Sequence, residues 1–135
     1  MPVIDASILA SYLVRDELFE EAKEILSTWG LLAPDLLIPE VTNVIWKHVY
    51  LYRRIREKEA IRLIEGMKIL VNNIKIINSM KVIDNAFKIA VKLGITMYDS
   101  IYLALAINNN DKLETFDKKL KSKVQGTEYE KYVKI

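Results

Sequence analysis

Residues 98–107 read YDSIYLALAI, a run that is apolar on nearly every side of a helix. Such a helix has no polar face to turn toward water, so we expect it to be buried on several sides. On either side of it, short strand-like runs such as 74–77 and 112–115 alternate with helical stripes. This alternation indicates a parallel sheet covered on both faces. The predicted fold class is α/β, a three-layer α/β/α sandwich with a central parallel sheet.

The other predicted elements continue the alternation. Further strands are predicted at 3–4, 31–33 and 132–135, and further helices at 6–13, 39–54, 56–71, from 83 to Gly94, and 117–123. A helix is also predicted after Asp16, with Trp29 on its inward stripe. The chain has 135 residues, of which 51% are hydrophobic, which suits one core. We therefore expect a single domain over 1–135.

Composition restricts the kind of metal site that this chain can build. The sequence has no Cys and one His, which excludes disulfides, thiolate zinc sites and imidazole-rich sites. Any metal must then be held by carboxylates, which favours hard ions such as Mg²⁺ or Mn²⁺. The net charge of +2 neither demands nor excludes a polyanionic partner.

The N-terminus shows no targeting signal. It reads MPVID and lacks a basic segment followed by a signal-like apolar stretch. No apolar run approaches the length that spans a membrane. We expect a soluble cytoplasmic protein with no membrane partner.

Four acidic residues fall where a parallel sheet would bring them together. Asp5 ends the first predicted strand, Glu40 opens the helix after the second, Asp99 opens the buried helix, and Asp117 follows the strand at 112–115. In open α/β sheets, ligands bind beyond the carboxyl ends of the strands. Carboxylates gathered there would repel one another, and a divalent cation removes that repulsion. The pattern predicts one acidic metal site.

Each acid taken alone also has a purely structural interpretation. Asp5, Asp99 and Asp117 are suited to capping the helices that follow them. Glu40 in a first turn suits the helix dipole. The joint placement of all four at the expected ends is what favours a functional site.

Four segments carry a resemblance to a known family. They are VIDAS (3–7), IPEVTNVI (38–45), YDSIYLALA (98–106) and LETFDKKL (113–120). In this order and at these separations they resemble the PIN domain, and the chain is most similar to the VapC toxins of VapBC toxin–antitoxin pairs. The resemblance covers essentially the whole chain.

The resemblance implies a PIN-like fold and a Mg²⁺- or Mn²⁺-dependent endoribonuclease that hydrolyses RNA phosphodiester bonds. It assigns the catalytic and metal-binding quartet to Asp5, Glu40, Asp99 and Asp117, and supporting polar roles to Ser7 and Thr115. It also implies an RNA substrate, a cognate antitoxin protein and a homodimer. From the chemistry, Asp5 and Asp99 are expected to be direct ligands, and the two hydroxyls either fix carboxylate rotamers or touch the scissile phosphate.

The same residues argue against two other folds that carry acidic sites. A haloacid-dehalogenase-like phosphatase needs a second Asp two places after the first, where this chain has Ser7. A receiver domain needs a phosphoacceptor Asp after its third strand, where this chain has Asn78 and Ser79. Two alternatives stay open: a PIN nuclease of RNA processing or repair, and a module that binds RNA or protein without cutting. The quartet favours an enzyme over the binding module.

The helices at 39–54 and 56–71 carry more apolar side chains than one core needs. Trp46 and Tyr50 lie off the inward stripe of the first helix, and Ile61 and Ile69 lie off that of the second. Aromatic residues are enriched at the centres of protein interfaces. We expect this pair of helices to offer a surface to a homodimer partner, an antitoxin helix, or both. The alternative is that the aromatic rings fold back onto neighbouring helices.

Overall fold

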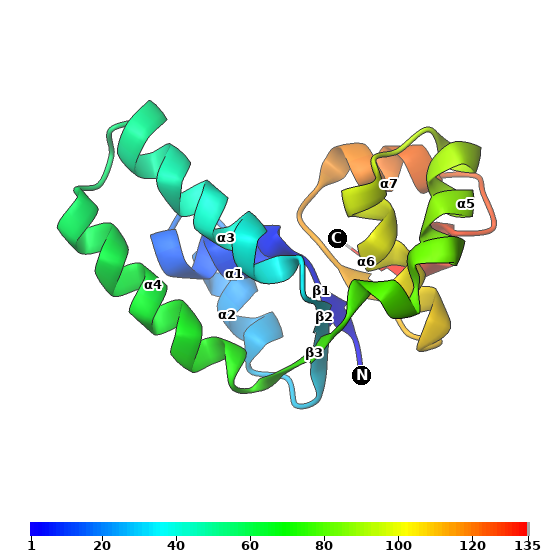
Figure 1. Cartoon of the computed structure of the whole chain (residues 1–135), viewed down its shortest axis with the longest axis horizontal. Helices are drawn as coiled ribbons and strands as arrows, with labels where there is room; N and C mark the ends of the chain where they lie inside the picture. The colour runs from blue at the N-terminus through cyan, green and yellow to red at the C-terminus, as the bar shows by residue number, and fades with distance from the viewer. Residues whose placement is uncertain (135) are drawn as a thin grey trace.

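A parallel sheet lies between two layers of helices in the computed structural model, which describes residues 1–134 (Figure 1). The strand order is β3-β2-β1-β4-β5, and all neighbouring strands are parallel. The strands are β1 (Val3–Ile4), β2 (Leu31–Pro34), β3 (Ile74–Ile77), β4 (Leu113–Glu114) and β5 (Val133–Lys134). The predicted α/β fold with a central parallel sheet is confirmed.

The helices are divided between the two faces of the sheet, with α1 to α4 on one side and α5 to α7 on the other (Figure 1). They are α1 (Ala6–Val14), α2 (Phe19–Leu26), α3 (Leu37–Trp46), α4 (Glu57–Val71), α5 (Ile83–Leu93), α6 (Met97–Asn108) and α7 (Lys118–Val124). Shorter turns are η1 (Lys47–Leu51), η2 (Ser79–Lys81) and η3 (Glu130–Tyr132). Within the described residues no single helix is long and apolar enough to cross a membrane; only α5 and α6 taken together pass that test, and the chain bends by 118° between them.

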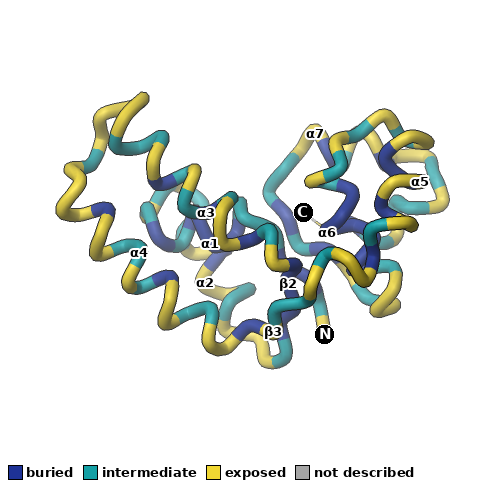
Figure 2. The backbone as a smooth tube through the Cα atoms, viewed as in Figure 1, coloured by how far each residue is buried: buried dark blue, intermediate teal, exposed yellow. Residues whose placement is uncertain are grey.

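Helix α6 is the most deeply embedded helix, as its sequence predicts. Every residue from Ser100 to Ala106 is buried. Thr96 caps its first turn, since its hydroxyl accepts a hydrogen bond from the backbone N–H of Asp99 at 3.2 Å. Figure 2 shows buried positions gathered at the central strands, while α4 keeps an exposed outer side. The cap fixes where α6 begins, and so it fixes the position of Asp99 at the edge of the core.

Three predicted elements differ from the structure. The helix predicted at 39–54 starts earlier, at Leu37, and passes after Trp46 into the π-helical turn η1. The strand predicted at 132–135 is observed as β5 but begins one residue later, at Val133, and residue 135 lies outside the described part of the chain. The inward placement of Trp29 is wrong, because α2 ends at Leu26 and the indole is 94% exposed.

The strand order creates a crevice at one edge of the sheet. The chain runs outward from β1 through β2 to β3, then crosses back over α5 and α6 to place β4 on the other side of β1. The chain therefore leaves the carboxyl ends of β1 and β4 toward opposite faces of the sheet, into α1 and α7 respectively. A topological switch point of this kind is where open α/β sheets bind ligands.

Candidate metal centre

Asp5 and Thr115 meet directly at the switch point. In the parallel register Val3 pairs with Leu113 and Ile4 with Glu114, so Asp5 and Thr115 are the next residues on two adjacent strands. The Thr115 hydroxyl donates a hydrogen bond to Asp5 Oδ2. Strand pairing alone thus brings together two residues that are 110 positions apart in the sequence.

Ser7 and Thr115 hold the carboxylate of Asp5 from both sides. The backbone N–H of Ser7 donates to Asp5 Oδ1 at 3.0 Å, and its hydroxyl donates to the same oxygen. The two hydroxyl oxygens in turn accept backbone hydrogen bonds, Ser7 Oγ from Phe116 and Thr115 Oγ1 from Asp117, each at 3.0 Å. Of the two roles expected for these hydroxyls, the geometry shows the first, which is to fix the rotamer of Asp5.

Glu40 reaches the crevice from α3 and is held there by Tyr102. The phenolic hydroxyl of Tyr102 donates to Glu40 Oε1 at 2.6 Å. The negative charges of Glu40, Asp5 and Asp99 all raise the pKa of Tyr102, after desolvation by burial, which is the larger cause. The phenol therefore stays protonated, and three of the four predicted acids surround it.

Asp117 has a structural duty in addition to its place in the crevice. Its Oδ1 accepts hydrogen bonds from the backbone N–H groups of Lys119 and Leu120, at 2.9 and 3.1 Å, and so caps α7. Its other carboxylate oxygen accepts none among the described residues. The negative charge of Asp117 raises the pKa of Asp99, after burial of Asp99 itself, which puts these two acids on the same side of the site.

The capping interpretation is therefore partly right. Asp5 caps α1 as well as lying in the crevice, and Asp117 caps α7. Asp99 is not a cap, because Thr96 fills that position in α6. Capping does not account for Asp99 and Glu40, and it leaves one oxygen of Asp117 free.

The four acids share an uncompensated negative charge. Within residues 1–134 none of them makes an ion pair. Burial raises the pKa of Asp5 to about 6, although the hydrogen bonds from Ser7 and Thr115 act in the opposite direction and lower it. Burial also raises the pKa values of Glu40 and Asp99. The neighbouring Glu114 differs from these four acids because it has a cationic partner: its carboxylate lies 3.5 Å from Lys134 Nζ.

The donor set fits a hard divalent cation. Carboxylate oxygens without a cationic partner are the ligands that Mg²⁺ and Mn²⁺ prefer. Within the described chain, no three acidic or imidazole side chains already stand in a geometry that would hold an ion. Asp5, Glu40 and Asp117 are instead held by neighbouring hydrogen-bond donors. Like-charged groups without a cation also gain free energy by staying apart. Binding would then require side-chain rotation, for which Glu40 and Asp117 each keep an oxygen free of hydrogen bonds.

The raised pKa of Asp5 predicts how metal-free stability depends on pH. The folded protein binds this proton up to about pH 6, while an ordinary Asp releases it near 3.8. The folded state therefore loses stability as pH rises between these values. In EDTA, the unfolding free energy of Asp5→Asn minus that of the wild type should increase by about 2 kcal/mol from pH 4 to pH 7. Urea denaturation at both pH values measures this difference, and an unchanged difference would contradict the shifted pKa.

Tyr102 is the member of the site that the sequence analysis missed. It lies three residues after Asp99 on α6, a spacing that puts both side chains on one helix face. That spacing was a usable signal, but the apolar surroundings of Tyr102 hide it as an ordinary core residue. Only the contact with Glu40 distinguishes its hydroxyl.

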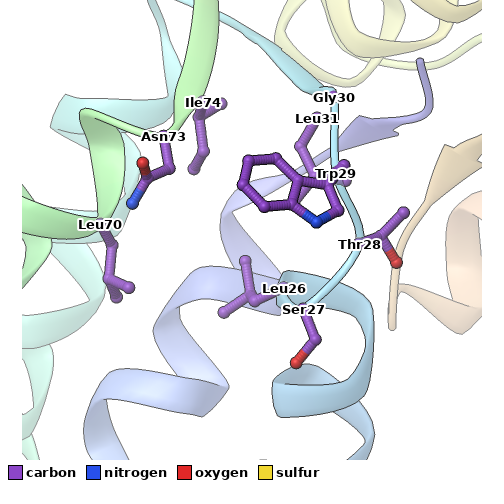
Figure 3. Close-up of a pocket in the computed structure, with 9 residues that line it drawn as sticks. All are labelled: Leu26, Ser27, Thr28, Trp29, Gly30, Leu31, Leu70, Asn73 and Ile74. Atoms are coloured by element: carbon purple, nitrogen blue, oxygen red, sulfur yellow. The ribbon is translucent and has the colours of Figure 1, made fainter.

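A second hollow lies at the opposite edge of the sheet (Figure 3). It has a volume of about 230 Å³ and lies beside the starts of β2 and β3, with Trp29 among its lining residues. Its lining has no acidic residue and no Lys or Arg: Leu26, Ser27, Thr28, Trp29, Gly30, Leu31, Leu70, Asn73 and Ile74. The lining of this hollow therefore has no charged side chain with which to neutralise a metal ion or a phosphate.

Comparison with known proteins points to one family. Residues 3–124 match the PIN domain. The chain is 37% identical over 124 residues to Ribonuclease VapC3 of Pyrobaculum aerophilum, covering 90% of this chain and 92% of the relative. The crystal structure of PAE2754 from the same organism is 25% identical, with a TM-score of 0.67 over 93% of this chain and 87% of the other. A toxin–antitoxin complex from Klebsiella pneumoniae gives a TM-score of 0.70 at 18% identity, over 100% of this chain and 97% of the other.

Proposed function

The chain belongs to the PIN domain family as a ribonuclease of the VapC toxin type, and we propose that Asp5, Glu40, Asp99 and Asp117 form its catalytic metal site. The observation that supports this most is the absence of any cationic partner for these four acids within residues 1–134, at the switch point of the sheet. We further propose that residues 1–135 act as one nuclease domain, in the cytoplasm with the RNA substrate.

The chain's own residues have separate tasks in this proposal. Bound Mg²⁺ or Mn²⁺ supplies Lewis-acid chemistry, lowering the pKa of a water and offsetting charge on the phosphate. Asp5, fixed by Ser7 and Thr115, provides the rigid ligand, and Asp99 provides the second. Glu40 is oriented by Tyr102, so one of its oxygens is positioned while the other stays free for the ion or a water.

The products of cleavage test the proposed reaction. Attack by water at phosphorus, without use of the ribose 2′-hydroxyl, leaves a 5′-phosphate and a 3′-hydroxyl. We expect purified protein with Mn²⁺ to cut single-stranded RNA into fragments with those ends, detected by end-specific ligation and mass spectrometry. Fragments that end in a 2′,3′-cyclic phosphate would show that the 2′-hydroxyl is the nucleophile and would reject the proposed mechanism.

Exposed apolar side chains of α3, η1 and α4 form one surface, here called the α3–α4 surface, on which we base the proposed partners. Trp46 and Tyr50 are 48% and 62% exposed, and their rings stack on each other with centroids 5.3 Å apart. Ile61 and Ile69 of α4 are 54% and 67% exposed. This exposure argues against the alternative that the two rings fold back onto neighbouring helices. We propose that this surface pairs with a second copy of the chain and that a cognate antitoxin is a further partner.

Trp46→Glu tests the homodimer. A charge placed at the centre of an apolar interface loses its hydration on association, so the substitution should weaken the dimer at least about 100-fold. Multi-angle light scattering over a concentration series should give a dimer for the wild type and a monomer for the variant. Asp84→Asn, an exposed change in the first turn of α5 on the other face of the sheet, is the control and should stay dimeric. A wild type that is monomeric at high concentration would contradict the dimer.

A further inference from the structure

A groove runs alongside the acidic site between α3 and the start of α6. Its volume is about 450 Å³, within the range of sites that bind small organic groups. Its residues are Ala6, Leu36, Pro39, Glu40, Asn43, Val44, Lys47 and Tyr98. Glu40 belongs both to this groove and to the acidic site, so the two are continuous. Whatever enters the groove therefore lies next to the reacting phosphate.

One wall of the groove is a single face of α3 and of its helical continuation into η1. Glu40, Asn43 and Lys47 follow the spacing i, i+3, i+7, which aligns their side chains along the helix. Asn43 makes no side-chain hydrogen bond and Lys47 no ion pair among the described residues. Along this face the Glu40 carboxylate comes first, beside the acidic site, and the Asn43 amide follows. The unpaired ammonium of Lys47 comes last, on a residue about 10 Å along the helix axis from Glu40.

The other wall presents an open aromatic ring. Tyr98 is 60% exposed although it directly precedes Asp99, a half-buried member of the acidic site. Across the groove lie apolar atoms of Pro39 and Val44. These groups match the parts of an unpaired nucleotide. The aromatic ring can stack on the base, the amide can hydrogen-bond the edge of the base, and the cation can neutralise a phosphate.

We propose that this groove binds one unpaired nucleobase of the RNA strand beside the scissile phosphate. Tyr98 stacks on the base, the Asn43 amide reads its edge, and Lys47 contacts a neighbouring phosphate. This proposal rests on the proposed ribonuclease function. It adds a structural origin for any sequence preference at the cleavage site. A paired base must first unpair and leave its stack to enter the groove, which costs free energy, so the groove favours an unpaired base.

Two readouts on a randomised single-stranded RNA pool test the groove. One is the base frequency around each cut, obtained by sequencing the fragments formed with Mn²⁺. The other is the affinity of the labelled pool in fluorescence anisotropy. Tyr98→Ala should lower kcat/KM and affinity about 5- to 100-fold, since a stacked base contributes that much. Tyr98→Phe keeps the stack and should behave as wild type. Asn43→Ala should flatten the base preference at one position.

Matched controls separate the groove from general effects. Trp29→Ala removes an exposed aromatic at the opposite edge and should leave both readouts unchanged. Lys47→Met should reduce the salt dependence of binding by about one phosphate contact, whereas Lys68→Met should not. A purely structural role of Tyr98 in placing Asp99 would lower the rate but leave the base preference unaltered.

The outcomes distinguish the two proposals. Wild-type cleavage with unchanged base preference and affinity in Tyr98→Ala and Asn43→Ala overturns the groove and leaves the ribonuclease standing. Absence of cleavage by the wild type counts against the ribonuclease, and the anisotropy series then decides the groove alone. Tight pool binding that depends on Tyr98 supports the groove in either case.

Discussion

Asp5→Asn is expected to lower RNA cleavage by more than about 100-fold, because removing a fixed ligand forfeits several kcal/mol of the stabilisation that the metal gives the transition state. Asn is nearly isosteric with Asp, so the fold should persist. At pH 7 in EDTA the variant should even be about 1 kcal/mol more stable, since a buried charge disappears at the cost of about one imperfect hydrogen bond to Ser7 or Thr115. Cleavage rates at saturating metal and urea denaturation measure the two effects.

Asp84→Asn is the matched control for this substitution. Asp84 is exposed in the first turn of α5, on the helical layer that also contains α6. Its amide variant should cleave RNA at the wild-type rate. Wild-type activity in Asp5→Asn would reject the assignment of the quartet. Loss of activity together with loss of stability would instead indicate that Asp5 serves the fold through its hydrogen bonds with Ser7 and Thr115.

Removing the metal is expected to have an equally large effect. With EDTA the purified protein should show no RNA cleavage above background, and added Mg²⁺ or Mn²⁺ should restore it, because all proposed ligands are hard oxygen donors. The same ions should raise the thermal midpoint of the wild type, since a ligand that binds only the folded state stabilises it. Differential scanning fluorimetry with and without Mn²⁺ checks the second effect.

The control for the thermal shift is Asp5→Asn, which should gain little or nothing from either ion. Undiminished cleavage in EDTA would refute the metal mechanism. An ion-induced shift that is equal in the wild type and in Asp5→Asn would place the ion elsewhere on the chain. A wild-type protein that binds RNA and Mn²⁺ without cutting would favour the alternative of a binding module.

The sequence was sufficient to predict the layers of the fold, because those depend on local periodicity. The strand at 74–77 was predicted with its observed bounds, and the buried helix at 98–107 is the core of α6. The same periodicity misplaced Trp29, since nothing local marks that α2 stops at Leu26 before the inward stripe continues. Periodicity describes a face, but it does not say where that face ends.

The positions of the four acids at strand ends and helix starts were also predictable, because such ends lie at one edge of a parallel sheet; their role as a metal site stays a prediction. What only the tertiary structure decided is how they are held. The order β3-β2-β1-β4-β5 puts Thr115 beside Asp5, and helix packing puts Tyr102 beside Glu40 and Tyr98 across from Asn43. These contacts join residues up to 110 positions apart. Their geometry depends on strand register and side-chain packing, which are set by the whole fold and leave no periodic trace in the sequence.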